Sequence, residues 1–182
     1  MEIIDLPGTY SLTAKSIDEL IARNFIVEEK PDVVVDIVDA SNLERNLYLT
    51  IQLLELEANL VVALNKFDVA KNLGYEIDVK KLSNLLGVPV VPTVATTKEG
   101  MEELKDKIVE AALKKRKPPK VVYGEEAERV IEAVEEVLKK DITLVERYPT
   151  RWLAIKLLEG DEEAMKIVEK SPYRDEIMEV LS

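Results

Sequence analysis

The sequence predicts an α/β domain, with a parallel sheet and flanking helices, followed by a small all-helical domain. In the first part of the chain, short runs that are apolar on both faces alternate with longer amphipathic patterns. At residues 116–120 a linker of two prolines and three charged residues interrupts the chain, and only helical patterns follow it. We therefore place the α/β domain at residues 1–117 and the helical domain at residues 121–182.

The predicted strands are continuous apolar runs of strand length. They lie at residues 33–38 (VVVDIV), 60–64 (LVVAL) and 90–94 (VVPTV), and residues 2–4 predict a further short strand end. Runs without polar alternation are typical of parallel strands buried between two layers of helices. Strands separated by helices at this spacing predict right-handed crossovers and therefore a doubly wound sheet.

Helical patterns fill the intervals between these strands. The first begins at Ser16, where the order Ser-Ile-Asp-Glu has the form of a capping box, and runs to about Val27. Gly87 suits a left-handed position at the end of the helix before it. The remaining helices are expected at residues 43–56, 79–86 and 100–115, and beyond the linker at 125–140, 150–158, 161–170 and 173–181.

The composition excludes several classes of protein. Cysteine and histidine are absent, which rules out disulfides, thiol and imidazole catalysis, and zinc or iron–sulfur sites built on these ligands. A metal could be held only by oxygen ligands, which favours a hard ion such as Mg²⁺. The net charge of −11 argues against a nucleic-acid partner. No apolar run approaches the roughly 20 residues that span a bilayer, so we expect a soluble, cytosolic polypeptide.

Three motifs that could carry chemistry follow predicted strands. The first is Asp5-Leu6-Pro7-Gly8. Ligands of open α/β sheets bind at the carboxyl ends of strands, where Asp5 could hold Mg²⁺ and Gly8 could let its amide approach a terminal phosphate. The alternative is an ordinary strand-to-turn junction, in which Asp, Pro and Gly are all common.

The second motif is Asn65-Lys66-Phe67-Asp68, after the strand at 60–64. The Asp68 carboxylate could accept two hydrogen bonds from the N1–H and exocyclic amine of guanine, a donor pair that adenine lacks. Asn65 would brace the loop, and the stem of Lys66 would pack along the base. The alternative is an Asn-initiated turn that leads into a helix.

The third motif is Ala95-Thr96-Thr97, after the strand at 90–94. Here backbone amides would approach O6 of guanine. The alternative is a helix N-cap before residues 98–104. Together, the three motifs have the order and spacing of the later motifs of a G protein, which contact Mg²⁺ and the γ-phosphate first and the base afterwards.

Longer stretches around these motifs resemble the G domain of ferrous iron transport protein B. They are DLPGTYSL at 5–12, DASNLERNLYLTIQLLEL at 39–56 and ALNKFD at 63–68. YPTRWLAIKLLEGD at 148–161 resembles the helical domain that follows the G domain in that family. The resemblance covers nearly the whole chain and implies a P-loop-GTPase-like sheet.

The resemblance also implies the roles of individual residues. It makes Asp5 a magnesium contact, Gly8 a γ-phosphate contact, and residues 9 to about 16 a switch that responds to that phosphate. Guanine would be read by Asn65, Lys66 and Asp68, with Ala95 and Thr96 closing over the base. The implied cofactors are GTP or GDP with Mg²⁺. The implied partner is the membrane-embedded Fe²⁺-transporting domain of the same parent protein, at the cytoplasmic face of the cell membrane.

One element of that family has no counterpart in the sequence. Members carry a GxxxxGK[ST] phosphate-binding loop and a first switch ahead of DLPG, and neither occurs among the 182 residues. The sheet is therefore expected to be incomplete at its N-terminal side, which would expose apolar side chains of residues 33–38. We interpret the chain as a fragment that binds guanine nucleotide weakly or not at all and does not hydrolyse GTP alone. The alternative is that a second chain or an exchanged element supplies the loop.

The sequence leaves two other functions to consider. A truncated or degenerate G domain could act as a non-enzymatic regulatory or oligomerising module, in which a homo-oligomer would be expected. Another translation- or membrane-associated GTPase is disfavoured by the 39–50 stretch. In the helical domain, the acidic residues of 125–136 are interpreted as a solvated face, with iron or the membrane domain as the alternative ligand. Trp152, Leu153, Ile155 and Leu157 are expected in the core.

Overall fold

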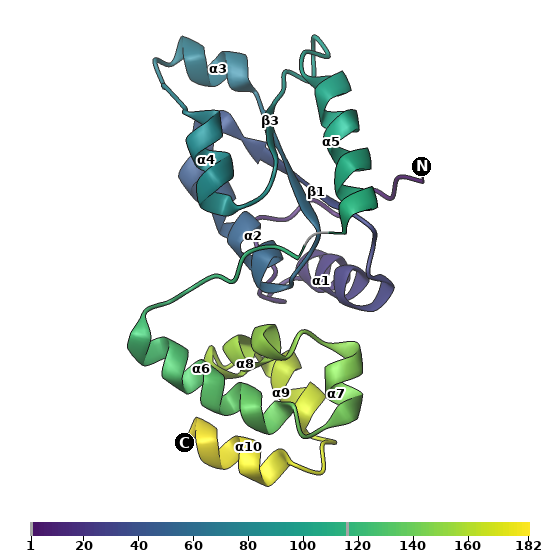
Figure 1. The fold of residues 1–182 in the computed structure, drawn as a ribbon, viewed down its shortest axis with the longest axis vertical. Helices are drawn as coiled ribbons and strands as arrows, with labels where there is room; N and C mark the ends of the chain where they lie inside the picture. Colours follow the sequence, from purple (N-terminus) through teal and green to yellow (C-terminus); the bar gives the residue numbers. More distant parts are fainter. Residues whose placement is uncertain (1, 116) are drawn as a thin grey trace. The chain divides into compact units, whose positions relative to one another are not determined.

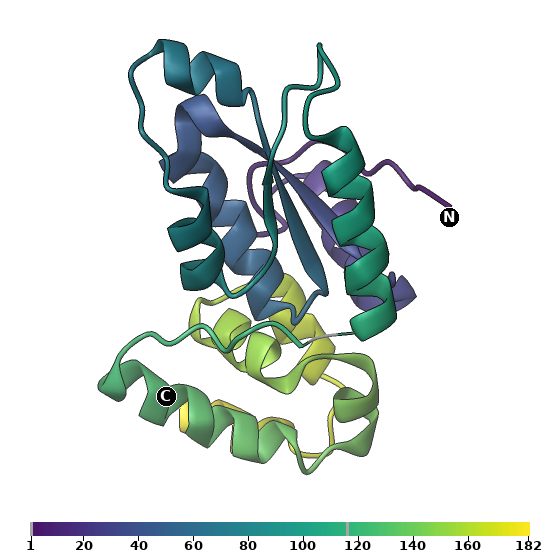
Figure 2. The same cartoon turned by 45° about the horizontal axis from the view of Figure 1, so that its top comes forward.

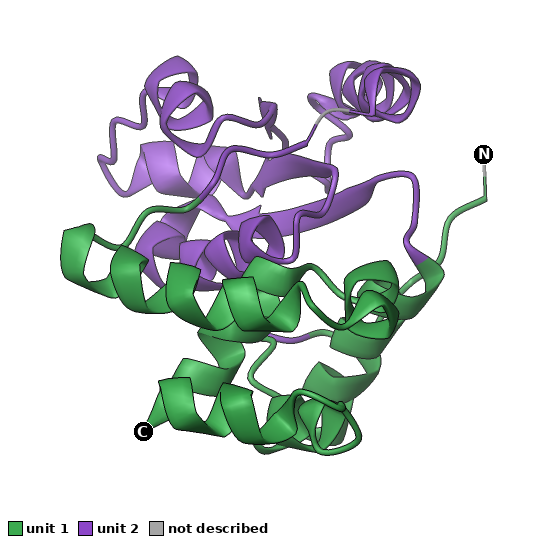
Figure 3. Cartoon of the chain, turned by 60° about the horizontal axis from the view of Figure 1, so that its bottom comes forward, with its two compact units in different colours: residues 1–8, 12–29, 121–182 green, residues 9–11, 30–120 purple. Residues whose placement is uncertain are grey.

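The computed structural model describes residues 2–115 and 117–182, so Met1 and Arg116, the first residue of the predicted linker, lie outside the described residues. These residues, drawn as a ribbon in Figure 1, form two compact units, which Figure 3 colours separately. Unit 1 contains the residues up to Gly8, residues 12–29 and residues 121–182, and unit 2 contains residues 9–11 and 30–120. The units are interleaved along the sequence, and the domain division at 1–117 and 121–182 stays a prediction.

Unit 2 is built on a parallel sheet whose described strands have the order β1-β2-β3. The strands are β1 (Val34–Asp39), β2 (Leu60–Asn65) and β3 (Val90–Pro92). All three lie within the predicted runs or one residue beyond them. The pairing places Asp39 opposite Asn65, so β1 and β2 end at the same level of the sheet.

Helices cover both faces of this sheet, and Figure 2 shows α2 and α4 on one face and α5 on the other. Against α5, an apolar cluster joins Val61, Ala63 and Val91 of the sheet to Leu104 and Ala111 of the helix. The helical elements of unit 2 are η1 (Ala40–Asn42), α2 (Leu43–Glu55), α3 (Phe67–Asn72), α4 (Val79–Leu86) and α5 (Met101–Lys114). Gly87 ends α4 with φ +67°, as predicted.

The strand predicted at residues 2–4 is wrong. These residues have no regular secondary structure, and Ile3 and Ile4 are 78% and 55% exposed. A strand needs a neighbour to take up its backbone hydrogen bonds, and no described strand pairs with this segment. On β1, by contrast, the predicted exposure of apolar side chains is confirmed at Val35 and Ile37, which are 37% and 68% exposed.

Unit 1 is helical. Its elements are α1 (Ile17–Glu29), α6 (Glu125–Leu138), α7 (Ile142–Arg147), α8 (Thr150–Leu158), α9 (Glu162–Val168) and α10 (Arg174–Leu181). The predicted cap of α1 is present, because the Glu19 amide donates to Ser16 Oγ at 3.2 Å. The predicted core residues Trp152, Leu153, Ile155 and Leu157 are buried. No described helix combines the length and the apolar character needed to cross a bilayer.

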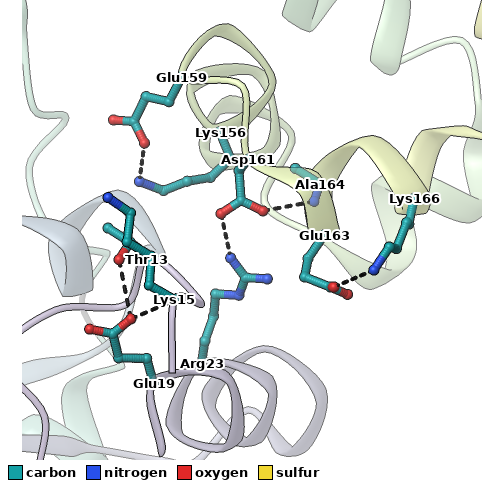
Figure 4. A network of polar contacts seen from close by, with 10 residues as sticks. All are labelled: Thr13, Lys15, Glu19, Arg23, Lys156, Glu159, Asp161, Glu163, Ala164 and Lys166. Carbon is teal, nitrogen blue, oxygen red and sulfur yellow. Dashed lines mark hydrogen bonds and ion pairs between the residues drawn. The ribbon is translucent and has the colours of Figure 1, made fainter. Parts of the chain in front are cut away.

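Within unit 1, α1 is joined to the helices of the C-terminal part by one buried ion pair. Arg23 Nη1 lies 2.8 Å from Asp161 Oδ2, and their side chains are 2% and 6% exposed. The Arg23 guanidinium also lies over the Trp152 ring, 5.7 Å from its centroid. Asp161 Oδ1 accepts from the Ala164 amide and so caps α9, as Figure 4 shows.

Candidate functional site

The candidate site of unit 2 lies at the carboxyl edge of the sheet. Asn65 ends β2 and residues 66–68 follow it directly, while residues 93–100 lie between β3 and α5. Two backbone bonds join these segments: the Thr93 amide donates to Leu64 O at 2.9 Å, and the Phe67 amide donates to Thr93 O at 3.3 Å. The sheet therefore brings the second and third motifs together, as expected for ends of adjacent parallel strands.

Asn65 joins the two loops through its side chain. Its Oδ1 accepts from the Ala95 amide at 3.0 Å and from Thr93 Oγ1 at 3.4 Å. An amide oxygen that accepts two hydrogen bonds from the other segment fixes the separation of the two segments. Asn65 thus links the end of β2 to the segment that follows β3.

The loop that follows Asn65 presents Asp68 to solvent. Lys66 has φ +56° and ψ +35°, a left-handed conformation that turns the chain sharply into α3. Asp68 lies in the first turn of α3, is exposed, and bonds to no other described residue. Its two carboxylate oxygens are therefore available to donors on a ligand. Ala95 and Thr96 are exposed as well.

The alternative interpretation of the third motif, a helix N-cap, is wrong. α5 begins at Met101, and its N-cap is Gly100 with φ +77°. A Cβ at Gly100 would lie 2.1 Å from the carbonyl oxygen of Pro92, so glycine is required at this position by space and by backbone conformation. Residues 95–97 instead form a turn that Val94 and Glu99 close by an isolated bridge.

Asp39 is a member of this edge that the sequence interpretation missed. Lys66 Nζ donates to Asp39 Oδ2 at 2.6 Å, and Ser41 donates to Asp39 Oδ1 through its amide and its hydroxyl. Partial burial raises the pKa of Asp39, but hydrogen bonds from Lys66 and Ser41 outweigh it and hold the pKa below its usual value. The Asp39 carboxylate in turn raises the pKa of Lys66. The signal in the sequence that could have found it is an aspartate at the end of an apolar run of strand length, at residues 33–38.

Asp5 and Gly8 belong to unit 1. The other five predicted site residues belong to unit 2. Both are exposed. A Cβ at Gly8 would meet no other atom within 4 Å, so no packing inside the protein accounts for glycine there. Open space around Gly8 suits the close approach of a ligand to its amide.

The residues present fit a magnesium ion that is held jointly with phosphate. No three acidic side chains in 2–115 and 117–182 gather closely enough to hold a metal ion by themselves. Mg²⁺ binds through one or two carboxylates together with water and the phosphates of a nucleotide, rather than in cages of protein ligands. The exposed carboxylate of Asp5 provides this kind of oxygen donor.

Comparison with known families gives two matches that together span most of the chain. Residues 1–108 match the model of the family described as "Ferrous iron transport protein B". Residues 123–182 match the model of the "FeoB cytosolic helical domain".

Among curated proteins, the chain is 53% identical over 180 residues to the Fe(2+) transporter FeoB of Methanocaldococcus jannaschii, covering 99% of the chain and 26% of the relative. It is 44% identical over 176 residues to an Fe(2+) transport protein A/Fe(2+) transporter FeoB fusion protein of Porphyromonas gingivalis, covering 94% of the chain and 21% of the relative. The chain therefore spans about a fifth to a quarter of the curated relatives it matches.

Solved structures agree with these matches. The mGMPPNP-bound NFeoB from S. thermophilus is similar with a TM-score of 0.85 at 36% identity, over 97% of this chain and 66% of the other. The cytosolic domain of the T. maritima FeoB iron transporter in its GMPPNP form has a TM-score of 0.83 at 39% sequence identity, over 97% of this chain and 72% of the other. The FeoB G-domain from Methanococcus jannaschii has a TM-score of 0.59 at 65% sequence identity, over 60% of this chain and 70% of the other.

Proposed function

The chain belongs to the ferrous iron transport protein B family, and from this membership we propose that it is the guanine-nucleotide-binding region of a ferrous iron uptake transporter. In this proposal, GTP binding and hydrolysis in the parent protein are coupled to the passage of Fe²⁺ across the cell membrane. The region would lie at the cytoplasmic face, next to the membrane-embedded domain of the same protein. The arrangement of Asn65, Asp68 and Ala95 at the carboxyl edge of the sheet is the observation that carries it.

The chemistry of that edge suits guanine. Asp68 has an exposed carboxylate with no other described residue bonded to it, and guanine offers two parallel donors to such a group. Adenine would place a hydrogen-bond acceptor opposite the carboxylate, which would lose its hydrogen bonds. The free-energy cost of that loss would make the site select guanine over adenine. Lys66 would lie along the base plane, and the turn of Ala95 and Thr96 would close over the base edge.

The other end of the nucleotide is assigned to the segment Asp5 to Gly8. Asp5 would hold Mg²⁺, usually through water, and the Gly8 amide would donate to the γ-phosphate. When bound, Mg²⁺ neutralises negative charge on the phosphates. A displacement of Gly8 would move α1, which follows in the same unit. α1 is in turn joined to Asp161 through Arg23. This ion pair is a physical route for coupling to the helical part.

A second candidate function is a non-enzymatic module that uses the same fold as a regulatory or oligomerising platform. This candidate is favoured by two exposed apolar side chains of β1, Val35 and Ile37. Exposed apolar residues on a strand promote association with another chain. Nucleotide-independent self-association in solution would support this candidate.

The proposal is tested by titrating the 182-residue chain with fluorescent GDP and GTP in the presence of Mg²⁺, with ATP as the control. A second sample carries the phosphate-binding segment of a relative fused ahead of Met1. Guanine-selective binding by either sample supports the proposal. If neither sample prefers GTP over ATP, the proposed nucleotide site is wrong.

A further inference from the structure

Residues 39–46, here named the link segment, have no part in the base-reading or phosphate-binding roles proposed above. The segment reads DASNLERN and covers the end of β1, the η1 turn and the start of α2. The side chains of Asp39, Ser41, Arg45 and Asn46 have specific partners in unit 2. The partners outside the link segment belong to two segments of the proposed nucleotide site that are far apart in sequence, at Lys66 and at Tyr10.

The first partner is the segment 65–68, here named the base-reading loop. Asp39 is 25% exposed and receives the ammonium of Lys66 at 2.6 Å. The other oxygen of Asp39 accepts from Ser41, so the carboxylate cannot rotate away without breaking bonds on both sides. Lys66 is the residue whose left-handed backbone turns the chain from β2 into α3. Asp39 therefore fixes the side chain at the point where the base-reading loop bends.

The link segment is itself closed by hydrogen bonds. Asn46 Oδ1 accepts from the Asp39 amide at 3.3 Å, and Asn46 Nδ2 donates to Asn42 O at 2.9 Å. One side chain thus joins the start of the segment to its middle and its end. A segment closed in this way moves as a unit, because displacing one end breaks bonds at the other.

The second partner is the stretch that follows Gly8. The Arg45 guanidinium lies over the Tyr10 ring, 4.1 Å from its centroid. Tyr10 is 60% exposed, so burial does not explain its position. Residues 9–11 nonetheless group with unit 2, whereas the residues on both sides of them group with unit 1. The contact with Arg45 is one interaction that holds this stretch to unit 2, because cation–π pairs are attractive even at exposed sites.

We propose that the link segment is a positioning element that couples the terminal-phosphate end of the nucleotide site to the base-reading end. Arg45 positions the stretch after Gly8 through Tyr10, and Asp39 positions the base-reading loop through Lys66. A displacement of residues 9–11 by a terminal phosphate is then transmitted through residues 39–46 to Lys66. The inference rests on the proposed function, because it assigns the two ends of that site.

The first part of the test needs no nucleotide. Amide hydrogen exchange is measured by mass spectrometry on the 182-residue chain, comparing the parent with Arg45→Gln, Tyr10→Leu and Tyr10→Phe. An exposed cation–π pair corresponds to roughly two- to fivefold in an equilibrium constant. Exchange of residues 9–11 should accelerate by about this factor in Arg45→Gln and Tyr10→Leu. Tyr10→Phe keeps the ring and should match the parent. Arg129→Gln, an exposed arginine on α6, is the matched control.

The second part uses the chain with a relative's phosphate-binding segment fused ahead of it. For each variant, two affinity ratios are measured: GDP against IDP, which lacks the exocyclic amine, and a non-hydrolysable GTP analogue against GDP. Coupling predicts crossed effects of about two- to fivefold. Arg45→Gln should change the base ratio, and Asp39→Asn, which keeps an acceptor for Ser41, should change the phosphate ratio. Asp106→Asn on α5 is the control for Asp39→Asn.

The outcomes separate the inference from the proposed function. Crossed effects together with faster exchange support the coupling. Unchanged exchange in Arg45→Gln, or variants that each alter only the ratio at their own end, overturns it while leaving the nucleotide site intact. If the parent fusion binds no guanine nucleotide, the proposed function fails, and the positioning role fails with it.

Discussion

Arg23 and Asp161 are 138 positions apart in sequence and form an ion pair of 2.8 Å between Nη1 and Oδ2. Both side chains are almost fully withdrawn from solvent, and the guanidinium also faces the Trp152 ring. Desolvating two charges is costly, and such a pair is maintained only where geometry and further hydrogen bonds compensate. Asp161 has such a bond from the Ala164 amide.

Replacement of Arg23 by Ala should lower the free energy of unfolding of unit 1 by about 3–5 kcal/mol, because it leaves the Asp161 charge buried and unpaired. The measurement is urea unfolding followed by the fluorescence of Trp152, the only tryptophan of the chain. Arg23→Met combined with Asp161→Asn, which keeps the cap on α9, should recover much of the loss. If Arg23→Ala alone leaves the transition midpoint unchanged, the pair does not stabilise unit 1.

Asp36 should make unit 2 less stable as the pH rises. Its side chain is buried on β1 and accepts from Thr50 Oγ1 at 2.6 Å. Burial raises the pKa of Asp36 to about 6, although the Thr50 hydrogen bond opposes the shift. Because the folded-state pKa exceeds that of the unfolded chain, the stabilising protonated form is fully present below about pH 4. That contribution is lost as the pH rises through about 6.

Asp36→Asn should therefore stabilise the chain at pH 7.5 by up to about 3 kcal/mol, since the neutral amide keeps an acceptor for Thr50 and needs no buried charge. Below about pH 4 the variant and the parent should have nearly equal free energies of unfolding. Chemical denaturation at several pH values measures this difference. The exposed Asp106→Asn should show no such pH-dependent gain, and a gain for Asp36→Asn that is independent of pH would contradict the assignment.

Asp68→Asn should exchange guanine preference for xanthine preference by tenfold or more, because an amide can donate to the 2-oxo group of xanthine but cannot accept both guanine donors. The ratio of the GDP and XDP affinities is measured by letting the two nucleotides compete with a fluorescent nucleotide. The sample is the 182-residue chain or its fusion, whichever binds the fluorescent nucleotide. Asp106→Asn provides the matched control. Equal loss of both nucleotides would mean that Asp68 supports the loop rather than contacts the base.

Gly100→Ala should destabilise unit 2 by about 2 kcal/mol or more. The φ of +77° is costly for alanine, and its Cβ would collide with the Pro92 carbonyl oxygen. Gly74→Ala is the comparison, since Gly74 has φ +83° but nothing within 4 Å of a Cβ. Its cost should be only about 1 kcal/mol. Similar midpoints for the two variants in urea would show that the close approach to Pro92 is relieved by a small shift of the loop.

The sequence predicted the long elements of the fold well, because apolar runs and helical periodicity extend over enough residues to be distinguished. The two short helices α3 and α7 have six residues each, which is less than two turns. Such segments show no repeated apolar face, and neither was assigned bounds in advance. The strand at residues 2–4 failed for another reason: its composition suits a strand, but pairing partners are a property of the tertiary structure.

The position of Asn65, Lys66 and Asp68 at the carboxyl edge of the sheet could be predicted because they form a recognisable motif at the end of one apolar run. The contacts of Asp39 and Arg45 could not, because each depends on where a second segment of the chain arrives. The Asp39–Lys66 pair requires the register of β1 with β2. The Arg45–Tyr10 contact requires a three-residue stretch to join unit 2 between neighbours that belong to unit 1.

The interleaving of the two units determines the order in which the chain can fold during synthesis. Unit 2 is almost continuous, so its sheet can form as soon as residue 120 has emerged from the ribosome. α1 emerges earlier but must wait for Asp161, which at 5–20 residues per second takes on the order of ten seconds. During this interval Arg23 has no partner at the start of α9, so nascent chains are more exposed to chaperones and proteases until residue 161 has emerged.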